Sequence, residues 1–449
     1  MKSSLSQKCA EFVKKVQWKD IPEDVREKSK YYFLDWMGAL IAGSTTPDAS
    51  VIVNFINDQG GKPQANVIGL LEKTSCLHAA LGNGFISHIL EVDDVHSQSI
   101  SHPAAPVDAA ALSVAQYLNQ DGKSFLLSTI LGYEIMLRIG EAVTPSHYKI
   151  WHTTATCGTF GSAIAAGKLL DLSVDQLTHS MGNAGTQAAG LWEFLTTGAM
   201  SKYLHTGKAA MNGVISSLLA KTGYTGAWYI LEGDKGFIKA YSSEKNYQDK
   251  FENFGAPFKM IETSIKNYAS CTHTHTAIDS ILKIKDDFKL EPKNIKEINV
   301  YTYQDAKRIA GNMNPKTSIE AKFSIPYCVA AALLYHQVGL DEFLVSKISN
   351  PLISELIHKT NIIVDEECDR LRPSRWPSRV EIITYDNQRI KEGFDYPKGS
   401  PENPLSPKEL ETRFIQFSKR SFCEEKSRKL MEMILNLENL NNMNQLFKI

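Results

Sequence analysis

Long uninterrupted apolar runs are missing from this chain. None reaches the roughly 18 residues that a membrane-spanning helix needs, although 43% of the 449 residues are hydrophobic. The first residues, Met1–Lys8, lead into Glu11 and two lysines instead of an apolar signal segment. The sequence therefore predicts no membrane span, and its length predicts a large core divided between two domains.

An excess of charge of either sign is also missing. Lys and Arg total 49 and Asp and Glu total 50, so the formal net charge is −1. A protein with this balance creates no bulk electrostatic field that would attract nucleic acid or an anionic membrane. We therefore expect neither of these partners and consider small molecules instead.

Paired cysteines, internal repeats and a phosphate-binding loop are absent as well. The seven cysteines are odd in number and scattered without a C-x-x-C pair, which is typical of reduced thiols in the cytoplasm. The lack of a repeat period argues against an α-solenoid scaffold. Residues 58–62 lack the spacing and the Ser or Thr of a phosphate loop, so nucleotide-dependent chemistry is not expected.

One short segment is unusually dense in ionisable residues. It lies between two apolar runs, at 79–90 and 104–118, that are expected to be buried. Water is therefore scarce around its side chains, and this shifts the pKa of carboxylates and imidazoles toward the range that proton transfer uses. The pattern indicates a catalytic segment rather than a solvated loop. Its ionisable residues are Glu91, Asp93, Asp94, His96 and His102.

Apolar residues at helical spacing dominate the first 260 residues. Residues 22–43 begin with Pro22 and two acidic residues, which suit the first turn of a helix, and end near Gly43. Many of these segments are rich in Ala, Gly and Ser, which lets helix axes approach closely. The sequence predicts helices at 22–43, 74–90, 104–119, 123–143, 153–170, 174–190 and 202–222.

The pattern changes after about residue 260. Alternating polar and β-branched or aromatic residues predict strands at 297–303 and 379–385, with a hairpin partner at 389–393. Helices expected between them give an α+β domain. Residues 397–404 are rich in Pro and Gly and are expected to form a linker. The remaining predicted helices are 317–337, 351–359, 406–419 and 422–437, of which the last two are expected to rejoin the first domain.

Six motifs occur in order along essentially the whole chain. They are Glu91–Pro103, Trp151-His152, KYLHTG at 202–207, KNYASC at 266–271, AKFSIPY at 321–327 and KGSPENP at 398–404. As a set they resemble the MmgE/PrpD family, which includes 2-methylcitrate dehydratase, cis-aconitate decarboxylase and iminodisuccinate epimerase.

The resemblance implies a fold that is mainly α with a smaller α+β domain. Both chain ends, 1–262 and 401–449, are expected to form a large all-helical domain, and 263–400 an inserted α+β lid domain. The resemblance further implies a homodimer, an active site between the domains, and no metal or organic cofactor. The implied substrate is a small di- or tricarboxylate.

Reactions next to an acidic C–H need cations that hold the carboxylates, a base for the proton, and an acid. Lys202 and His205 share one helix face at their spacing, and with Lys266 they are expected to hold carboxylates. His102 or His152 is expected to move the proton, since an imidazole titrates near neutrality.

Further roles follow from the segment around these histidines and from the resemblance. Asp93 and Asp94 are expected to orient an imidazole or to raise its pKa, and the Tyr327 hydroxyl to donate to the oxygen that gains charge. The candidate catalytic residues are therefore His102, His152, Asp93, Asp94 and Tyr327, and the candidate substrate-binding residues are Lys202, His205, Lys266, Glu91 and Cys271.

Departures from the family pattern bear on the reaction. In the decarboxylase branch an Asp stands where this chain has Glu91, a Thr at Val95, and a His at Cys271. These departures argue against decarboxylation, and the dehydratase branch is also imperfectly matched around Asp93 and Asp94. We expect a dehydratase-like lyase, with dicarboxylate epimerisation as the alternative and cis-aconitate decarboxylation after it. A helical module that binds carboxylates without chemistry would keep the lysines but has no need of His102 and His152.

One short segment contains three residues that can bind zinc. Cys271, His273 and His275 alternate within five residues and would share one face of a strand. A structural site needs a fourth ligand from a second cluster, and no Cys/His pair is near in sequence. Metal binding at this position is therefore not expected.

Overall fold

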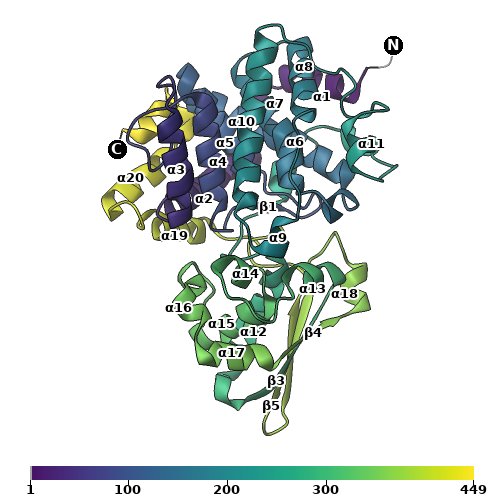
Figure 1. Ribbon diagram of the computed structural model, residues 1–449, viewed down its shortest axis with the longest axis vertical. Coiled ribbons are helices and arrows are strands. Elements are labelled where there is room, and N and C mark those ends of the chain that lie inside the picture. Colours follow the sequence, from purple (N-terminus) through teal and green to yellow (C-terminus); the bar gives the residue numbers. More distant parts are fainter. Residues whose placement is uncertain (1–2, 449) are drawn as a thin grey trace. The chain divides into compact units, whose positions relative to one another are not determined.

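The computed structural model describes residues 3–448, which form two compact units. Unit 1 contains the chain up to Ile89, Asp93–Thr263, and the chain from Ser406 onward. Unit 2 contains Leu90–Val92 and Ser264–Leu405. Unit 1 is helical and unit 2 combines helices with one four-stranded sheet, which confirms the expected mainly α fold with a smaller α+β part (Figure 1).

The helices of unit 1 begin where the sequence supplies a cap. Ser75, Asp121 and Ser173 each accept a hydrogen bond from the backbone N–H three residues later. All seven helices predicted before residue 260 are present, although α8 ends at Gly185 instead of 190. The helices are α1 (Leu5–Lys15), α2 (Glu23–Gly43), α3 (Pro47–Gln59), α4 (Cys76–His88), α5 (Ala104–Leu118), α6 (Gly122–Val143), α7 (Thr153–Leu169), α8 (Val174–Gly185), α9 (Phe194–Thr197), α10 (Ser201–Lys221), α11 (Phe237–Tyr241), α19 (Pro407–Ser418) and α20 (Glu424–Leu435).

Helix α10 lies in the middle of unit 1 and packs against α4, α5, α7 and α8 (Figure 1). Glycines make the closest approach possible. A Cβ on Gly207 would lie 2.3 Å from the carbonyl oxygen of Leu81, and one on Gly84 would lie 3.0 Å from the Cα of Gly207. The expected close packing of small residues is therefore present, and it brings the end of α4 beside the start of α10.

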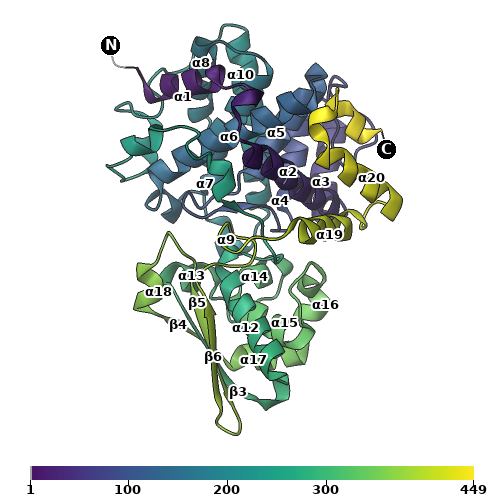
Figure 2. The ribbon, with the colours of Figure 1, turned by 180° about the vertical axis from the view of Figure 1, so that it is seen from behind.

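The two C-terminal helices belong to unit 1. Figure 2 shows α19 beside α2, and Arg413 of α19 donates to Asp35 Oδ1 of α2 at 2.7 Å. Both side chains are largely buried, so this ion pair joins α2 of the N-terminal part to α19 of the C-terminal part.

Unit 2 is built around a sheet with strand order β4-β3-β5-β6. Strand β3 pairs in parallel with β4 and antiparallel with β5, and helix α12 packs against β5 and β6. The elements are α12 (His275–Phe288), β3 (Ile295–Thr302), α13 (Gln304–Ala310), α14 (Ser318–Lys322), α15 (Ile325–Tyr335), α16 (Val345–Ile348), α17 (Pro351–His358), β4 (Thr360–Val364), α18 (Glu366–Arg370), β5 (Ser378–Thr384) and β6 (Arg389–Phe394). Two further strands, β1 (Val95–His96) and β2 (Thr263–Ser264), have two residues each.

Three predictions for this part of the chain need correction. The helix predicted at 317–337 is two helices, because Ser324 caps a new helix whose first turn contains Pro326. Strand β4 was missed, since its five residues offer too short a pattern. The segment 397–404 is not an open linker: Ser400 is buried, and the Gly399 carbonyl accepts from the backbone N–H of Ile265 at 2.9 Å.

Within residues 3–448, no single helix is long and apolar enough to cross a membrane. The bent pair of α2 and α3 passes that test only when the two helices are taken together.

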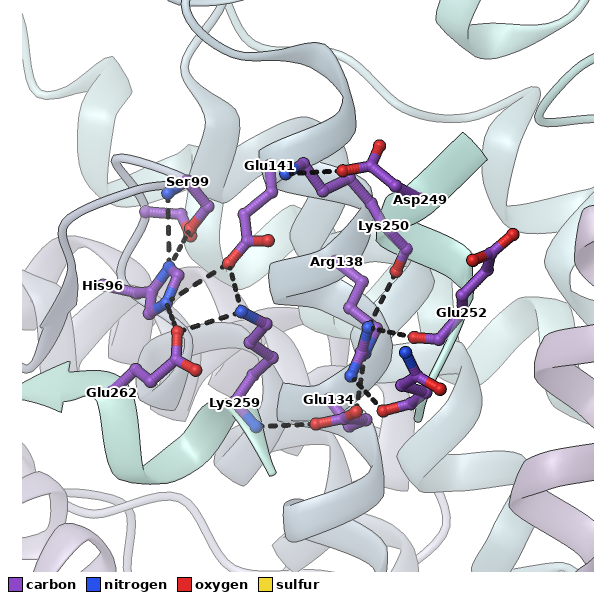
Figure 3. Close-up of polar contacts among 12 residues, drawn as sticks. His96, Ser99, Glu134, Arg138, Glu141, Asp249, Lys250, Glu252, Lys259 and Glu262 are labelled. Atoms are coloured by element: carbon purple, nitrogen blue, oxygen red, sulfur yellow. Dashed lines mark hydrogen bonds and ion pairs between the residues drawn. The ribbon is translucent and has the colours of Figure 1, made fainter. Parts of the chain in front are cut away.

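A buried ion pair organises the loop 250–259 of unit 1 (Figure 3). Arg138 Nε donates to Glu134 Oε1 at 2.6 Å, and its other nitrogens donate to the carbonyls of Lys250, Glu252 and Asn253. Glu134 in turn accepts from the backbone N–H groups of Gly255 and Lys259. One helix turn of α6 therefore satisfies backbone groups all along this loop.

The substitution Arg138→Met tests this arrangement. It leaves the Glu134 carboxylate buried without its cation and three carbonyls without a donor, so we expect the free energy of unfolding to fall by about 3–5 kcal/mol. Arg428→Met breaks a pair of the same spacing with Glu424 on an exposed surface, and a much smaller loss is expected there, because solvent screens an exposed pair. Urea denaturation of both variants makes the comparison. Equal losses would contradict the role of the buried pair.

Candidate active site

His88 is the last residue of α4, and its imidazole is fully buried. Its Nδ1 lies 2.6 Å from Asp93 Oδ2, and the Asp93 side chain is fully buried too. A carboxylate only accepts hydrogen bonds, so Nδ1 of His88 is the donor in this contact. Nε2 of the same ring is buried with no hydrogen-bond partner in the described chain.

Asp94 holds the loop that follows. Its Oδ1 accepts from the backbone N–H of Ala104, at the start of α5, at 3.0 Å. Its Oδ2 accepts from the Tyr133 hydroxyl at 2.9 Å. Burial raises the pKa of the Asp94 carboxyl well above its usual range, and the adjacent Asp93 raises it further.

His102 ends this loop, immediately before Pro103. Its backbone N–H donates to Thr154 Oγ1 at 3.0 Å, which fastens it to the first turn of α7. Its Nδ1 lies 2.7 Å from the Asp94 carbonyl oxygen, which can only accept, so Nδ1 donates. The proton on Nδ1 makes Nε2 the ring nitrogen that exchanges protons. The side chain is 13% exposed, whereas that of His88 is fully covered.

His152 caps α7, and its backbone N–H donates to the Gly190 carbonyl at 2.9 Å. Its Nδ1 lies 3.2 Å from Nδ1 of His205, one turn into α10. Burial and the neighbouring His205 and Lys202 hold the pKa of His152 well below its usual range. Burial, His88 and Lys202 lower the pKa of His205 to about 4. Both imidazoles are therefore neutral near pH 7.

Lys202 lies in the first turn of α10 and is buried, with 4% of the residue exposed. Its positive charge contributes to the lowered pKa of both His152 and His205.

Three histidines, His88, His102 and His152, form what we call the imidazole cluster. The ring centroid of His102 lies 5.0 Å from that of His88 and 6.3 Å from that of His152. One ring nitrogen from each lies within 4.8 Å of the other two. Residues from the end of α4, the loop before α5 and the start of α7 thus converge within unit 1.

Unit 1 therefore brings together six of the ten predicted site residues, namely Asp93, Asp94, His102, His152, Lys202 and His205. Sequence reasoning missed His88. His88 lies near the end of the helix predicted at 74–90, five residues before Asp93. The ionisable segment, however, was defined only from Glu91 onward.

The other four predicted residues lie in unit 2. Lys266 is 1% exposed, and its Nζ lies 3.0 Å from the Glu91 carbonyl oxygen and 3.4 Å from Glu91 Oε2. Cys271 is buried, and its backbone N–H donates to the Lys322 carbonyl at 2.9 Å. Glu91 and Lys266 are therefore a buried ion pair of unit 2.

Tyr327 does not fit the role expected of it. It is fully buried in α15, and its hydroxyl donates to the backbone carbonyl of Glu342. Burial also raises the pKa of this phenol far above its usual range. The residue is a core aromatic whose hydroxyl is satisfied within unit 2, so we leave it out of the mechanism.

The two histidines that follow Cys271 contact other groups of unit 2. His273 Nδ1 lies 2.6 Å from the Tyr303 hydroxyl, and its ring stacks on Trp376. His275 Nε2 lies 3.1 Å from the Ser270 carbonyl. Among residues 3–448 these side chains are not in a group of three that could hold a metal ion.

Comparison with known proteins identifies the family. The model of the MmgE/PrpD N-terminal domain matches residues 7–250, and that of the C-terminal domain matches residues 268–439. The chain belongs to the MmgE/PrpD family. The resemblance seen in six short motifs is thus confirmed over most of the chain.

Relatives within the family carry the name of one activity. The cis-aconitate decarboxylase of Aspergillus terreus is 26% identical over 472 residues, covering 100% of this chain and 96% of the relative. A cis-aconitate decarboxylase-like protein of Aspergillus oryzae is 25% identical over 93% of this chain and 91% of its own length. The human cis-aconitate decarboxylase is 23% identical over 98% and 93%.

The lowered pKa of His205 predicts a pH-dependent stability. The unfolded chain binds a proton at this residue near pH 6.5, whereas the folded protein binds it only near pH 4. Stability is therefore lost as the pH falls through this window, by on the order of 2 kcal/mol for this residue. Urea denaturation of the wild type and of His205→Asn between pH 7 and 4 measures the difference, and the variant should lose less. His358→Asn, at an exposed position, should follow the wild type. A variant slope equal to the wild-type slope would exclude the effect.

Proposed function

We propose that this protein is a lyase that acts on a small polycarboxylate, and that its reaction is the decarboxylation of cis-aconitate or a close analogue. The observation that carries the proposal is the imidazole cluster beside the buried Lys202, in a chain related over its whole length to proteins named cis-aconitate decarboxylase. A polycarboxylate requires a cation at the site, and the reaction requires a proton donor.

Decarboxylation of cis-aconitate consumes one proton and releases one CO2. The bond between the CH2 carbon of cis-aconitate and its carboxylate breaks, and CO2 leaves. The electron pair of that bond forms a new C=C bond, while the pair of the old C=C bond takes a proton at the far carbon. The enzyme must therefore supply one acid at carbon and hold the two carboxylates that remain. No oxidant, reductant or electron-accepting cofactor is needed in this sequence.

His102 is the candidate acid. Its Nδ1 is fixed as a donor to the Asp94 carbonyl, so the proton that is transferred lies on Nε2. Its partial exposure lets the imidazole recover a proton from water after each turnover. His152 and His205 are held neutral near pH 7, which argues against them as acids in the substrate-free protein.

Lys202 is the candidate anchor for a substrate carboxylate, and His152 and His205 are candidate hydrogen-bond donors to it. An anion that enters beside these rings favours their charged forms, which the burial and Lys202 disfavour in its absence. Substrate binding is therefore coupled to proton uptake at His152 and His205.

Dehydration of a hydroxylated tricarboxylate such as 2-methylcitrate is the second candidate. Val95, where the decarboxylase branch has a hydroxyl-bearing Thr, is buried in β1 of unit 1. The same His102 that protonates carbon in one reaction would protonate a leaving hydroxyl in the other.

Incubation in deuterated water distinguishes the reactions. The purified protein is supplied separately with cis-aconitate, 2-methylcitrate, citrate and iminodisuccinate, and the products are followed by NMR. We expect CO2 release from cis-aconitate and one deuterium at carbon in the product. Loss of water from 2-methylcitrate without decarboxylation would assign the dehydratase instead. Exchange without net conversion of iminodisuccinate would assign an epimerase.

The substitution His102→Gln tests the assigned acid. It keeps a hydrogen-bonding side chain but removes the transferable proton, so kcat should fall by about 10²–10⁴-fold. His358→Gln, on an exposed part of α17, is the matched control and should retain wild-type kcat. Turnover by His102→Gln at the wild-type rate would remove this residue from the mechanism.

A further inference from the structure

Three side chains at one end of the sheet of unit 2 carry buried nitrogens that have no hydrogen-bond partner. They are Nε and Nη1 of Arg372, Nε1 of Trp376 and Nε2 of His273, each without a partner among residues 3–448. A buried polar atom without a partner is costly, and folded proteins contain few of them. A group from outside the chain that pairs with these nitrogens would therefore stabilise this part of unit 2.

The fold brings the three side chains into contact. Strands β3 and β5 pair Thr302 with Ser378, so Tyr303 and Trp376 follow each other at the same end of the sheet. The ring of His273 stacks on Trp376, with centroids 4.8 Å apart. The guanidinium carbon of Arg372 lies 4.1 Å from the centre of the Trp376 ring and 4.7 Å from that of Tyr303. These ring faces stabilise the charge of Arg372, but they are weak acceptors for its N–H groups.

The tautomer of His273 follows from its contact with Tyr303. Nδ1 lies 2.6 Å from the Tyr303 hydroxyl, which has no other hydrogen bond within the described chain. The hydroxyl therefore uses its proton for this bond, and Nδ1 accepts it. Burial, followed by the positive charges of Arg372 and Arg308, holds the pKa of His273 well below its usual range, so the ring carries one proton. That proton is on Nε2.

All four nitrogens are consequently donors, because guanidinium and indole nitrogens only donate. The local charge has the same preference. Arg308 is paired with Asp305 at 3.0 Å, whereas no carboxylate among residues 3–448 forms an ion pair with Arg372. Several donors around a cation exclude a metal ion as the occupant and favour an oxyanion, with which guanidinium forms short, strong hydrogen bonds.

We infer that Arg372, Trp376 and His273 form a binding site for a small oxyanion, either phosphate or a carboxylate. Arg372 supplies the charge, and the two rings supply neutral donors. Arg372 is only partly buried as a residue, so an ion can reach it from solvent. The inference goes beyond the proposed function, because none of the three residues is a candidate catalytic or substrate-binding residue.

The indole N–H of Trp376 reports on binding directly. Protein labelled with nitrogen-15 tryptophan is titrated with sodium phosphate and, separately, with sodium acetate, at an ionic strength held constant with NaCl. The Trp376 signal, assigned through Trp376→Phe, should move downfield and saturate, because its N–H gains an acceptor. The ion that saturates the signal at the lower concentration identifies phosphate or carboxylate as the preferred group. A Trp376 signal that neither ion moves would overturn the inference.

The substitution Arg372→Gln removes the charge of the site. The affinity read from the Trp376 signal should fall at least about 10-fold, since hydrogen bonds to a charged group are the strong ones. Arg375→Gln is the matched control. Arg375 lies in the same loop but is paired with Asp395 at 2.9 Å, and its loss should change the affinity by no more than about twofold, because solvent screens it. Equal losses in the two variants would contradict the site.

The test does not depend on the proposed function. Oxyanions can also bind at Lys202, but the Trp376 signal reports only on its own surroundings, and no turnover is measured. A protein that fails to decarboxylate cis-aconitate would therefore still give this result. Circular dichroism shows whether Arg372→Gln is folded. If it is not, Arg372→Lys keeps the charge without the planar set of donors, and a smaller loss of affinity is expected. Unchanged affinity in a folded Arg372 variant would exclude the site.

Discussion

Two adjacent buried carboxylates, Asp93 and Asp94, determine where the candidate site histidines His88 and His102 of unit 1 lie. Asp93 orients His88, while Asp94 holds the start of α5 through its side chain and His102 through its backbone carbonyl. Two carboxyl groups side by side in a buried segment are costly, and the raised pKa of Asp94 reflects this cost. The hydrogen bonds from Ala104 and Tyr133 offset part of it. The site therefore depends on groups that would destabilise the fold if they lost their partners.

Close helix packing supplies the second constraint. The approach of α4 to α10 depends on Gly84 and Gly207, whose missing side chains let backbone meet backbone. This approach places His88, at the end of α4, beside His205 and Lys202, at the start of α10. A Cβ at Gly207 would separate these helix ends and, with them, Lys202 and His205 from His88. The same small residues therefore set both the packing of α4 against α10 and the positions of the candidate site residues at the ends of these helices.

Much of this arrangement could be predicted from the sequence because it has a local cause. Helical periodicity and side-chain caps define the helices, and the dense ionisable segment at 91–102 marks the site. The grouping of His152, Lys202 and His205 with that segment depended on resemblance, since residues far apart in the chain converge only through tertiary packing. The contact of Tyr327 could not be predicted for the same reason: nothing in its local sequence indicates that the Glu342 carbonyl accepts a hydrogen bond from its hydroxyl. Strand β4 escaped detection because its five residues offer too short an alternating pattern.

The central claim is that unit 1 holds His102 with its proton on Nδ1 and keeps His152 neutral, so that the two rings have different roles. Nitrogen-15 NMR of histidine-labelled protein measures both properties, with signals assigned through His102→Gln and His152→Gln. We expect that at pH 7 the His102 signal is that of a ring protonated at Nδ1 and that His152 is neutral, with a pKa well below 6.5. A neutral His102 with its proton only on Nε2, or a His152 that titrates near pH 6.5, would contradict the claim.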